Sequence, residues 1–256
     1  MKDIDWETLD GVEEVVKLFK GSVIMIRGNS RKILPQIPDS RFNTILTDPP
    51  YDQTEYMPSL PDRVKKEFAQ EFRRLLKYDG NLILFCGYLD KWKWYYILRA
   101  ASMIFKREII WVYGNPSNIP APNNIQASHE TALWFAKTDR HYFKQKVLHR
   151  SWINVPVPSG ILKPEWIPDK KIYVTPKPIG LLKPLLGFST PEGGWVLDPF
   201  MGTGSTNVAS LKMHMHSVGI EKRRRIFDVA VSRVQELENR QKGQVKLTDI
   251  IANNGD

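Results

Sequence analysis

Short apolar runs alternate with amphipathic stretches along most of the chain. The apolar runs are rich in β-branched and aromatic residues, and their length and composition favour buried strands. The expected strands are residues 23–27, 43–47, 81–86, 108–113, 131–136, 195–197 and 217–220. Apolar residues at helical spacing predict helices over residues 62–77, 90–102, 205–212 and 225–238. Strands that alternate with helices predict a mostly parallel, doubly wound α/β sheet.

The alternation breaks between residues 114 and 175. Three prolines and four asparagines fall within residues 114–128, and Pro156, Pro158, Pro164 and Pro168 exclude long regular elements further on. Long loops inside a compact domain are usually functional or mobile. A chain of 256 residues suits one large domain. We therefore expect a single catalytic domain over residues 1–256 that carries a loop-rich insertion at 114–175.

Charge adds a candidate partner to this picture. The chain has 37 Lys and Arg against 28 Asp and Glu, a net charge of +9, which attracts polyanions such as nucleic acid. Residues 137–177 hold nine Lys or Arg and three acids, with aromatic residues between them. The candidate contacts with nucleic acid are Lys144, Lys146, Arg150, Lys163, Lys170 and Lys171. The alternative is a solvated basic face on an ordinary enzyme.

Cysteine and hydropathy exclude several classes. Cys86 is the single cysteine and lies in an apolar run, so it suits a core position and forms no internal disulfide or thiolate cluster. No apolar stretch approaches the ~20 residues that span a bilayer, and the N-terminus lacks an apolar signal region. The five histidines form no metal-binding pattern. We expect a soluble cytoplasmic protein without a metal site.

The first segment with chemical potential is Asp48-Pro49-Pro50-Tyr51, directly after an expected strand. Two successive prolines cannot continue a central strand, so the chain leaves the sheet in a stiff, extended conformation. This places a carboxylate, a free carbonyl and an aromatic ring at the carboxyl edge of the sheet, where open α/β sheets bind ligands. Such a set suits a planar ring that carries an amino group. The alternative is a proline turn before a capped helix.

The second segment, residues 196–206, joins an expected strand to an expected helix through a glycine-containing turn. Gly202 and Gly204 permit unusual backbone angles and close approach of a ligand. Ser205 or Thr206 can cap the helix, and Asp198 at the strand end can pair with a cation such as an α-ammonium group. The alternative is a tight turn with a capping acid and no ligand.

Glu221 strengthens the case for a nucleoside ligand. It lies about 20 residues after Asp198, at the end of the next expected strand. An acid in this position accepts hydrogen bonds from ribose hydroxyls in dinucleotide-binding folds. The glycine spacing departs from the full dinucleotide fingerprint, so the ligand class stays open at this point.

Taken together, these segments resemble the DNA amino-methyltransferases that act on adenine N6 or cytosine N4. Asp48-Pro49-Pro50-Tyr51 is similar to the family's catalytic signature, and residues 198–206 are similar to its cofactor signature. Thr175-Pro176-Lys177-Pro178 resembles the T-x-K-P element that precedes the cofactor signature. His129-Glu130, ahead of residues 133–137, also resembles a family segment.

The resemblance implies a fold, a cofactor and a set of site residues. The catalytic signature precedes the cofactor signature, as in the circularly permuted beta class, with a Rossmann-like methyltransferase sheet whose last strand is antiparallel. The implied cofactor is S-adenosylmethionine. The implied catalytic residues are Asp48, Pro49, Pro50 and Tyr51. The implied cofactor-binding residues are Asn29, Asp48, Thr175, Lys177, Asp198, Phe200, Gly202, Gly204, Ser205, Thr206 and Glu221. Asn29 departs from the family, which commonly has Asp there.

The implied activity is site-specific methylation of adenine N6 in double-stranded DNA, with the insertion as target-recognition region. Asp48 favours adenine, since Ser is more usual at this position in enzymes that methylate cytosine N4. The alternatives are a cytosine-N4 methyltransferase, an RNA methyltransferase and a catalytically silent nucleic-acid-binding module. A restriction endonuclease partner would be a separate chain, and both a monomer and a homodimer remain open.

Overall fold

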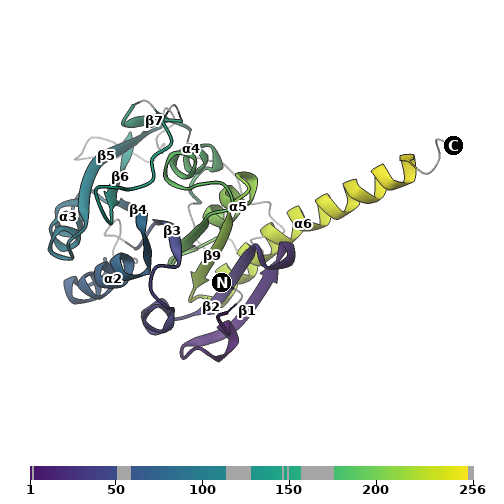
Figure 1. Ribbon diagram of the computed structural model, residues 1–256, viewed down its shortest axis with the longest axis horizontal. Helices are drawn as coiled ribbons and strands as arrows, with labels where there is room; N and C mark the ends of the chain where they lie inside the picture. The colour runs from purple at the N-terminus through teal and green to yellow at the C-terminus, as the bar shows by residue number, and fades with distance from the viewer. Residues whose placement is uncertain are drawn as a thin grey trace, which may run out of the picture.

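The computed structural model describes residues 1, 3–50, 59–113, 128–145, 147, 148, 150–156 and 176–252, with side chains as far as residue 243 (Figure 1). Nine strands form one sheet in the order β1-β2-β9-β8-β3-β4-β6-β5-β7. The strands are β1 (Val12–Leu18), β2 (Val23–Gly28), β3 (Phe42–Thr47), β4 (Leu76–Cys86), β5 (Ile104–Val112), β6 (His129–Ala136), β7 (Trp152–Asn154), β8 (Trp195–Asp198) and β9 (His216–Glu221). The helices are α1 (Ser30–Ile33), α2 (Asp62–Leu75), α3 (Lys91–Ala100), α4 (Ile179–Ser189), α5 (Ser205–Lys212) and α6 (Arg224–Ala252).

The strand directions agree with the expected mixed sheet. β2, β9, β8, β3 and β4 run parallel to one another. β6 is inserted between β4 and β5 and is antiparallel to both, whereas β1 pairs antiparallel with β2 at one edge. The last strand along this permuted chain, β9, is parallel to its neighbours. The expected antiparallel strand is instead β6, which lies inside the sheet.

Alternation of side chains along the strands builds a core on each face of the sheet. Leu82 and Leu84 of β4 pack into the cluster formed with α2 and α3, whereas Ile83 and Phe85 pack into the cluster formed with α4. α5 and α6 cover β2 on the second face through a third cluster around Phe227. Helices thus lie on both faces, as expected for a doubly wound sheet (Figure 1).

Four elements are not predicted by the sequence pattern: the four-residue helix α1, the strands β1 and β7, and the helix α4. β1 carries Glu13 and Glu14 and is only half-buried, and β7 has three residues, so neither shows a strand signal. α4 is apolar on nearly every side and contains Pro184, so it has no amphipathic period. The predicted helix over residues 62–77 is also too long, because α2 ends at Leu75 and β4 begins at the next residue.

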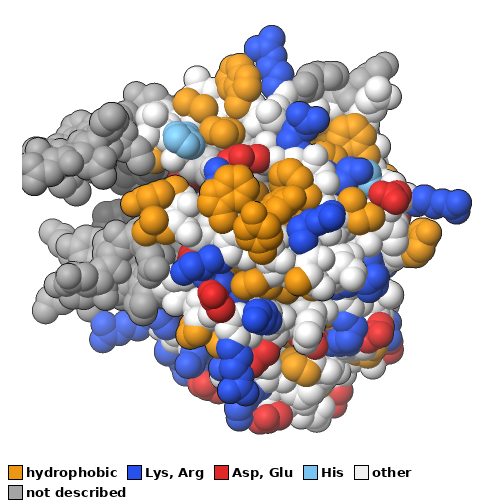
Figure 2. All heavy atoms as spheres, turned by 90° about the vertical axis from the view of Figure 1, so that its left-hand side faces the viewer, with side chains coloured by type: hydrophobic (Ala, Val, Ile, Leu, Met, Phe, Trp, Pro, Cys, Tyr) orange, Lys and Arg blue, Asp and Glu red, His pale blue; other side chains and the backbone are white. Residues whose placement is uncertain are grey.

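The surface beside α3 keeps several aromatic side chains exposed. Tyr88, Leu89, Trp92 and Tyr96 are each more than half exposed. Figure 2 shows this side of the molecule, with a group of hydrophobic side chains bordered by Lys and Arg. No helix within the described residues is long and apolar enough to cross a membrane.

Candidate active site

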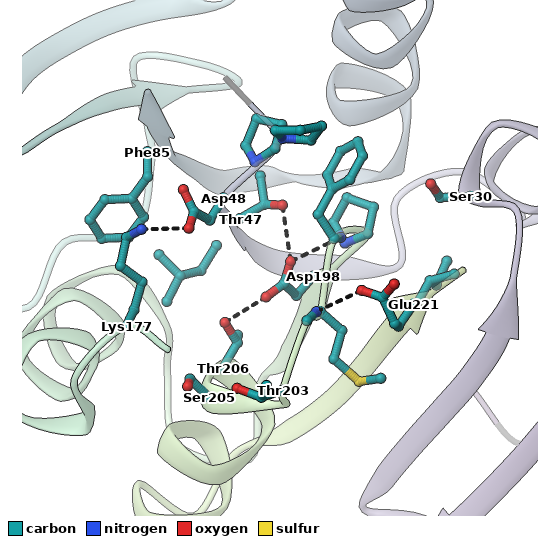
Figure 3. Close-up of a pocket in the computed structure, with 18 of the residues that line it drawn as sticks. Ser30, Thr47, Asp48, Phe85, Lys177, Asp198, Thr203, Ser205, Thr206 and Glu221 are labelled. Carbon is teal, nitrogen blue, oxygen red and sulfur yellow. Dashed lines mark hydrogen bonds and ion pairs between the residues drawn. The ribbon is translucent and has the colours of Figure 1, made fainter. Parts of the chain in front are cut away.

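A cavity of about 580 Å³ opens at the carboxyl edge of the sheet (Figure 3). Its lining residues come from the segments that follow four parallel strands, because parallel strands bring their carboxyl ends to one edge. They include Asn29 after β2, Asp48 and Pro49 after β3, Phe200 and Gly202 after β8, and Glu221 at the end of β9. The two segments predicted to carry the chemistry therefore meet in one cavity.

Asp48 is the acid at the end of β3. Its Oδ2 lies 2.5 Å from the Lys177 ammonium. Its Oδ1 is buried and has no hydrogen-bond partner among the residues that the structure describes. Burial raises the pKa of Asp48 above its usual range, and the positive charge of Lys177 opposes this shift. A buried acceptor without a donor costs about 1–3 kcal/mol, so the arrangement needs a functional explanation.

Lys177 joins two acids that lie far apart in the sequence. Its Nζ is 2.5 Å from Asp48 Oδ2 and 3.2 Å from Glu130 Oε2, and it lies 5.1 Å from the centre of the Phe85 ring. The side chain is only 9% exposed. Lys177 lines the cavity as expected of a cofactor-binding residue, but its charged end contacts Asp48. Glu130 was given no role by the sequence analysis, although its His-Glu segment resembled the family.

Asp198 organises the strand end from which the cofactor turn begins. It accepts hydrogen bonds from Thr206 Oγ1 at 2.7 Å, Thr47 Oγ1 at 3.0 Å and the Phe200 amide at 3.1 Å. Burial raises its pKa to about 6. Both oxygens are thus engaged by the chain itself, and a contact between Asp198 and an α-ammonium group stays a prediction.

The turn after β8 requires glycine at two positions. Gly202 has φ +52° and Gly204 has φ +77°, in the left-handed region that other residues rarely adopt. The predicted capping of α5 by Ser205 or Thr206 is wrong, because Gly204 is the N-cap and no side chain caps it. Thr206 donates to Asp198 instead, and Arg233 reaches Ser205 with a 3.5 Å hydrogen bond.

Glu221 closes the opposite end of the cavity. Its Oε2 accepts from the Gly202 amide at 3.2 Å, and its Oε1 accepts from the Arg223 amide at 2.8 Å. The side chain is 8% exposed and lines the cavity. Glu221 therefore fixes the glycine turn and also keeps a carboxylate at the cavity wall, where ribose hydroxyls can donate to it.

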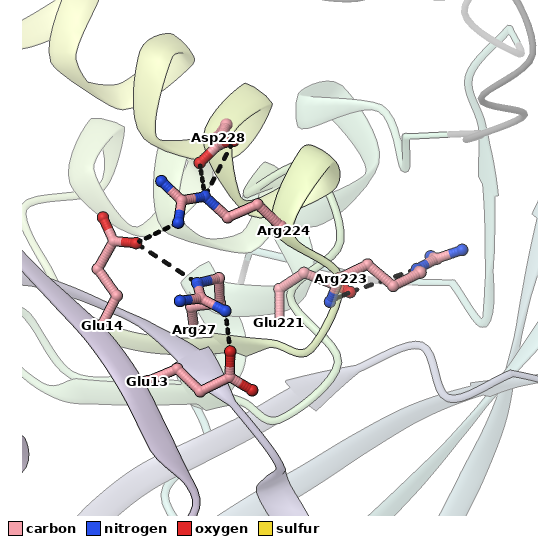
Figure 4. Close-up of polar contacts among 7 residues, drawn as sticks. All are labelled: Glu13, Glu14, Arg27, Glu221, Arg223, Arg224 and Asp228. Carbon is pink, nitrogen blue, oxygen red and sulfur yellow. Dashed lines mark hydrogen bonds and ion pairs between the residues drawn. The ribbon is translucent and has the colours of Figure 1, made fainter.

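A charged network lies beside Glu221 and ties the edge hairpin to α6 (Figure 4). Arg27 of β2 pairs with Glu13 and Glu14 of β1. Arg224 at the start of α6 lies 3.7 Å from the same Glu14 and 3.3 Å from Asp228. These pairs connect β1, β2 and α6 around the loop that follows Glu221. The edge strand β1, which the sequence pattern does not predict, therefore supports this end of the site.

Other predicted site residues have mixed outcomes. Asn29 lines the cavity, and its Oδ1 accepts from the Arg31 amide at 3.2 Å, which caps α1. Lys144 and Arg150 are exposed, and the Arg150 guanidinium lies 5.5 Å from the Trp152 ring centre. The following predicted residues lie outside the described residues: Tyr51, Lys146, Lys163, Lys170, Lys171 and Thr175. Among the residues with described side chains, no group of three His, Cys, Asp or Glu is arranged to hold a metal ion.

The cavity fits S-adenosylmethionine in size and chemistry. Ligand cavities commonly measure ~300–1,000 Å³, and this one lies within that range. Gly202 lets backbone approach a ligand, since a Cβ there would meet no side chain within 4 Å. The Glu221 carboxylate suits hydroxyl donors, and the unpartnered Asp48 Oδ1 suits an amino donor.

Loss of Glu221 is expected to weaken cofactor binding. Glu221→Ala removes acceptors for the ribose hydroxyls and releases the Gly202 amide. Hydrogen bonds to a charged group are worth about 1.5–3 kcal/mol, or roughly a ten- to a hundredfold change in the dissociation constant of S-adenosylmethionine. Titration calorimetry measures it, with Glu192→Ala as the control because Glu192 is exposed ahead of β8. An unchanged dissociation constant would remove Glu221 from the site.

Burial of Asp198 predicts a pH dependence of stability. Its pKa is raised from 3.8 to about 6 in the folded state, so the native protein holds this proton more tightly than the unfolded chain. Protonated Asp198 contributes at most ~3 kcal/mol to the free energy of unfolding. This contribution is complete below about pH 4 and is lost as the pH rises to about 6. Urea unfolding should show this fall in wild type and a smaller one in Asp198→Asn, which cannot titrate. Equal slopes in both proteins would contradict the assignment.

Comparison with known proteins identifies the family. The family model described as DNA methylase, of the N6/N4 methyltransferases, matches residues 42–232. The type II methyltransferase M.HinfI of Haemophilus influenzae is 24% identical over 251 residues, which cover 84% of this chain and 68% of the relative. The type II methyltransferase M2.DpnII of Streptococcus pneumoniae is 25% identical over 247 residues, which cover 86% and 92%.

Solved structures share the fold. M1.HpyAVI, solved in complex with SAM, superposes with a TM-score of 0.69 at 24% identity over 83% of this chain and 98% of that chain. The cytosine-N4-specific PvuII DNA methyltransferase superposes with a TM-score of 0.67 at 16% identity over 85% and 92%. The predicted methyltransferase fold and the family resemblance are confirmed. The chain belongs to the DNA methylase family, the N6/N4 amino-methyltransferases.

Proposed function

We propose that the protein transfers a methyl group from S-adenosylmethionine to N6 of adenine at a specific site in double-stranded DNA. The observation that carries the proposal is the state of Asp48. Its Oδ2 is bound by Lys177, while its Oδ1 is buried beside the cavity and receives no donor from the described part of the chain. An exocyclic amino group supplies the donor that this acceptor lacks.

The cofactor would lie along the cavity between Asp48 and Glu221. Glu221 would accept hydrogen bonds from its ribose hydroxyls, Gly202 and Gly204 would allow the backbone to approach it closely, and Asn29 would interact with its adenine. S-adenosylmethionine supplies a methyl group on a sulfonium, and methyl transfer converts that sulfonium to a neutral thioether. No residue of the chain has to accept the methyl group first.

Asp48 and Pro49 activate the amino group. Its nitrogen lone pair is delocalised into the base ring, which makes it a poor nucleophile. Hydrogen bonds from the two N–H groups to the Asp48 carboxylate and the Pro49 carbonyl draw the nitrogen toward tetrahedral geometry, so its lone pair is freed. These fixed acceptors also stabilise the positive charge that develops on nitrogen. Pro50 keeps the Pro49 carbonyl free because it has no N–H and stiffens the chain.

The target base has to leave the duplex to reach this cavity. Flipping a base out costs roughly a few kcal/mol. Tyr51 follows the two prolines and is placed by the motif to stack on the flipped base, which is worth about 1–3 kcal/mol. The aromatic ring provides this interaction, so Tyr51→Phe would preserve it.

Identification of the methylated nucleoside tests the proposed activity. Unmethylated DNA is incubated with the protein and S-adenosylmethionine, digested to nucleosides and analysed by mass spectrometry. N6-methyladenosine in its deoxy form is expected, because Asp48 supports adenine over cytosine. If N4-methyldeoxycytidine is found instead, the protein methylates cytosine N4 and not adenine N6. If RNA is methylated in preference to DNA, the proposed DNA substrate is wrong. No methylated product together with no cofactor binding would favour a silent DNA-binding module.

The basic insertion is proposed to contact DNA phosphates. Lys144 is exposed where its amide donates to the Phe188 carbonyl of α4, and Arg150 is exposed beside β7. Lys146 lies between them in the sequence. If all three contact phosphates, replacement by Gln should flatten the salt dependence of DNA binding. The slope of log K against log salt changes by about 0.9 for each contact. Fluorescence anisotropy at several salt concentrations measures this slope.

A matched variant separates this effect from a general loss of positive charge. Lys20, Lys183 and Lys212 are exposed on other elements, and their joint replacement by Gln removes the same net charge. The control should keep the slope close to that of wild type. An equal slope in both triple variants would place the DNA elsewhere on the surface.

A further inference from the structure

Lys177 is a cation that contacts two acids, Asp48 and Glu130. Figure 3 shows its contact with Asp48 in the cavity. It precedes α4, whereas Asp48 follows β3 and Glu130 belongs to β6, so three separate parts of the fold meet here. The ammonium is buried and lies against the Phe85 ring. A buried ion pair offsets its desolvation only with good geometry and further hydrogen bonds. The presence of such a pair in the cavity therefore indicates a role in the reaction.

The charged groups around Asp48 have opposite effects on its ionisation. Lys177 on one side favours its ionised form, whereas Glu130, bound to the same ammonium, disfavours it. Asp198 at the end of β8 is a further acid nearby. Burial is the main cause of its raised pKa, and the charge of Asp48 adds to the shift. Cys86 on β4 and Tyr113 after β5 are buried, and burial raises the pKa of both groups, so they stay neutral. Lys177 is therefore the cation that sustains the Asp48 carboxylate.

We infer that Lys177 and Glu130 are positioning residues for methyl transfer: Lys177 keeps Asp48 ionised and occupies Oδ2, and Glu130 shares the Lys177 ammonium and opposes its action on Asp48. This inference rests on the proposed function, in which Asp48 accepts a hydrogen bond from the target amino group. A protonated Asp48 would carry a donor where an acceptor is needed. With Oδ2 bound by Lys177, Oδ1 is the oxygen left for the amino group.

The two residues act on Asp48 in opposite directions, which gives a signature that a purely structural role lacks. Removal of the positive charge in Lys177→Met raises the pKa of Asp48, so the acid limb of the pH–rate profile moves to higher pH. Removal of the negative charge in Glu130→Gln lowers the pKa of Asp48, so this limb moves to lower pH. A charge within ~4–6 Å shifts a carboxyl pKa by about 1–3 units, and the more distant Glu130 should produce the smaller shift.

The test is the pH dependence of single-turnover methyl transfer in wild type, Lys177→Met, Lys177→Arg and Glu130→Gln. Lys177→Arg keeps the charge and should restore the acid limb toward that of wild type. Lys137→Met is the matched control, since Lys137 is a partly buried lysine bound to the Leu76 carbonyl at the other end of β4. Its acid limb should not move. Thermal unfolding checks that each variant is folded, and Glu130→Gln carries the test if Lys177→Met does not fold.

A second measurement reports on Asp48 without turnover. The ¹³C signal of the Asp48 carboxyl, assigned by its absence in Asp48→Asn, is titrated in the cofactor-free protein. Its pKa should rise in Lys177→Met and fall in Glu130→Gln. The dissociation constant of S-adenosylmethionine should stay within about threefold of wild type in Glu130→Gln, because Glu130 has no expected cofactor role. In Lys177→Met the same measurement separates the action of Lys177 on Asp48 from the cofactor-binding role that the family resemblance implies for it.

The outcomes separate this inference from the function on which it rests. Opposite shifts of the Asp48 pKa with unchanged cofactor affinity support the positioning roles. Unmoved pKa values and acid limbs overturn them, as does a cofactor affinity that falls tenfold or more in Lys177→Met without a pKa shift. If Asp48→Asn itself methylates DNA normally, the proposed role of Asp48 fails, whatever the behaviour of Lys177.

Discussion

Replacement of Asp48 by Ala is expected to lower methyl transfer by at least a hundred- to a thousandfold, the scale associated with loss of one preorganised electrostatic contact. The variant loses the acceptor that draws the amino nitrogen toward tetrahedral geometry. Lys177 also loses its 2.5 Å partner and keeps Glu130. A tritiated-methyl transfer assay measures the loss, and calorimetry should show cofactor affinity mostly intact.

Asp48→Asn is the sharper version of the same experiment. The amide has nearly the shape of the carboxylate but carries donors on one side. It also removes the charge that Lys177 neutralises. We expect a loss similar to that of Asp48→Ala, without a cavity. Substantial turnover in either variant would show that Asp48 does not activate the amino group.

The largest expected effect on stability belongs to Lys65. Its side chain is completely buried, and its Nζ donates to Asp90 Oδ1 at 2.6 Å and to Ser59 Oγ at 2.8 Å. Asp90 is itself 1% exposed. Lys65→Met removes the buried cation and leaves the Asp90 carboxylate with the half-exposed Lys93 ammonium 3.9 Å away. The free energy of unfolding should fall by about 3–5 kcal/mol, since the remaining cation is largely solvated. Urea denaturation with fluorescence detection measures the change.

A double variant isolates the contribution of the buried charge. Lys65→Met with Asp90→Asn removes both charges, so much of the lost stability should return relative to Lys65→Met alone. If the free energy of unfolding falls by less than about 1 kcal/mol in Lys65→Met, the pair behaves like a solvent-exposed ion pair, which contradicts its burial. Because Ser59 directly follows residues 51–58, the pair also anchors the chain just beyond the catalytic signature.

The sequence predicts the sheet well where strands are buried on both faces. β3 and β9 are buried over nearly their whole length, and each carries a short central run of apolar or small residues that reveals it in the sequence. β7 has three residues and belongs to the basic, proline-rich part of the chain, where local signals are weak. α4 is surrounded by core on most sides, so burial removes the polar face that reveals a helix in sequence.

The site was predictable as two motifs but not as a charge arrangement. Asp48 and Glu221 follow strands that local patterns reveal, and their meeting at one edge follows from parallel topology. The contact of Glu130 with Lys177 depends on β6 lying antiparallel between β4 and β5, which no local pattern specifies. The engagement of Asp198 by Thr47 likewise joins residues 151 positions apart.

The most direct test of the central claim is sequencing of modified bases in DNA from cells that express the protein. The host should lack its own DNA methylation, and the paired culture should express Asp48→Ala at equal level. We predict N6-methyladenine at one short sequence motif, nearly complete with wild type and absent with the variant. Modified cytosine in place of adenine, modification that persists with Asp48→Ala, or unmodified DNA despite a folded protein that binds S-adenosylmethionine would contradict it.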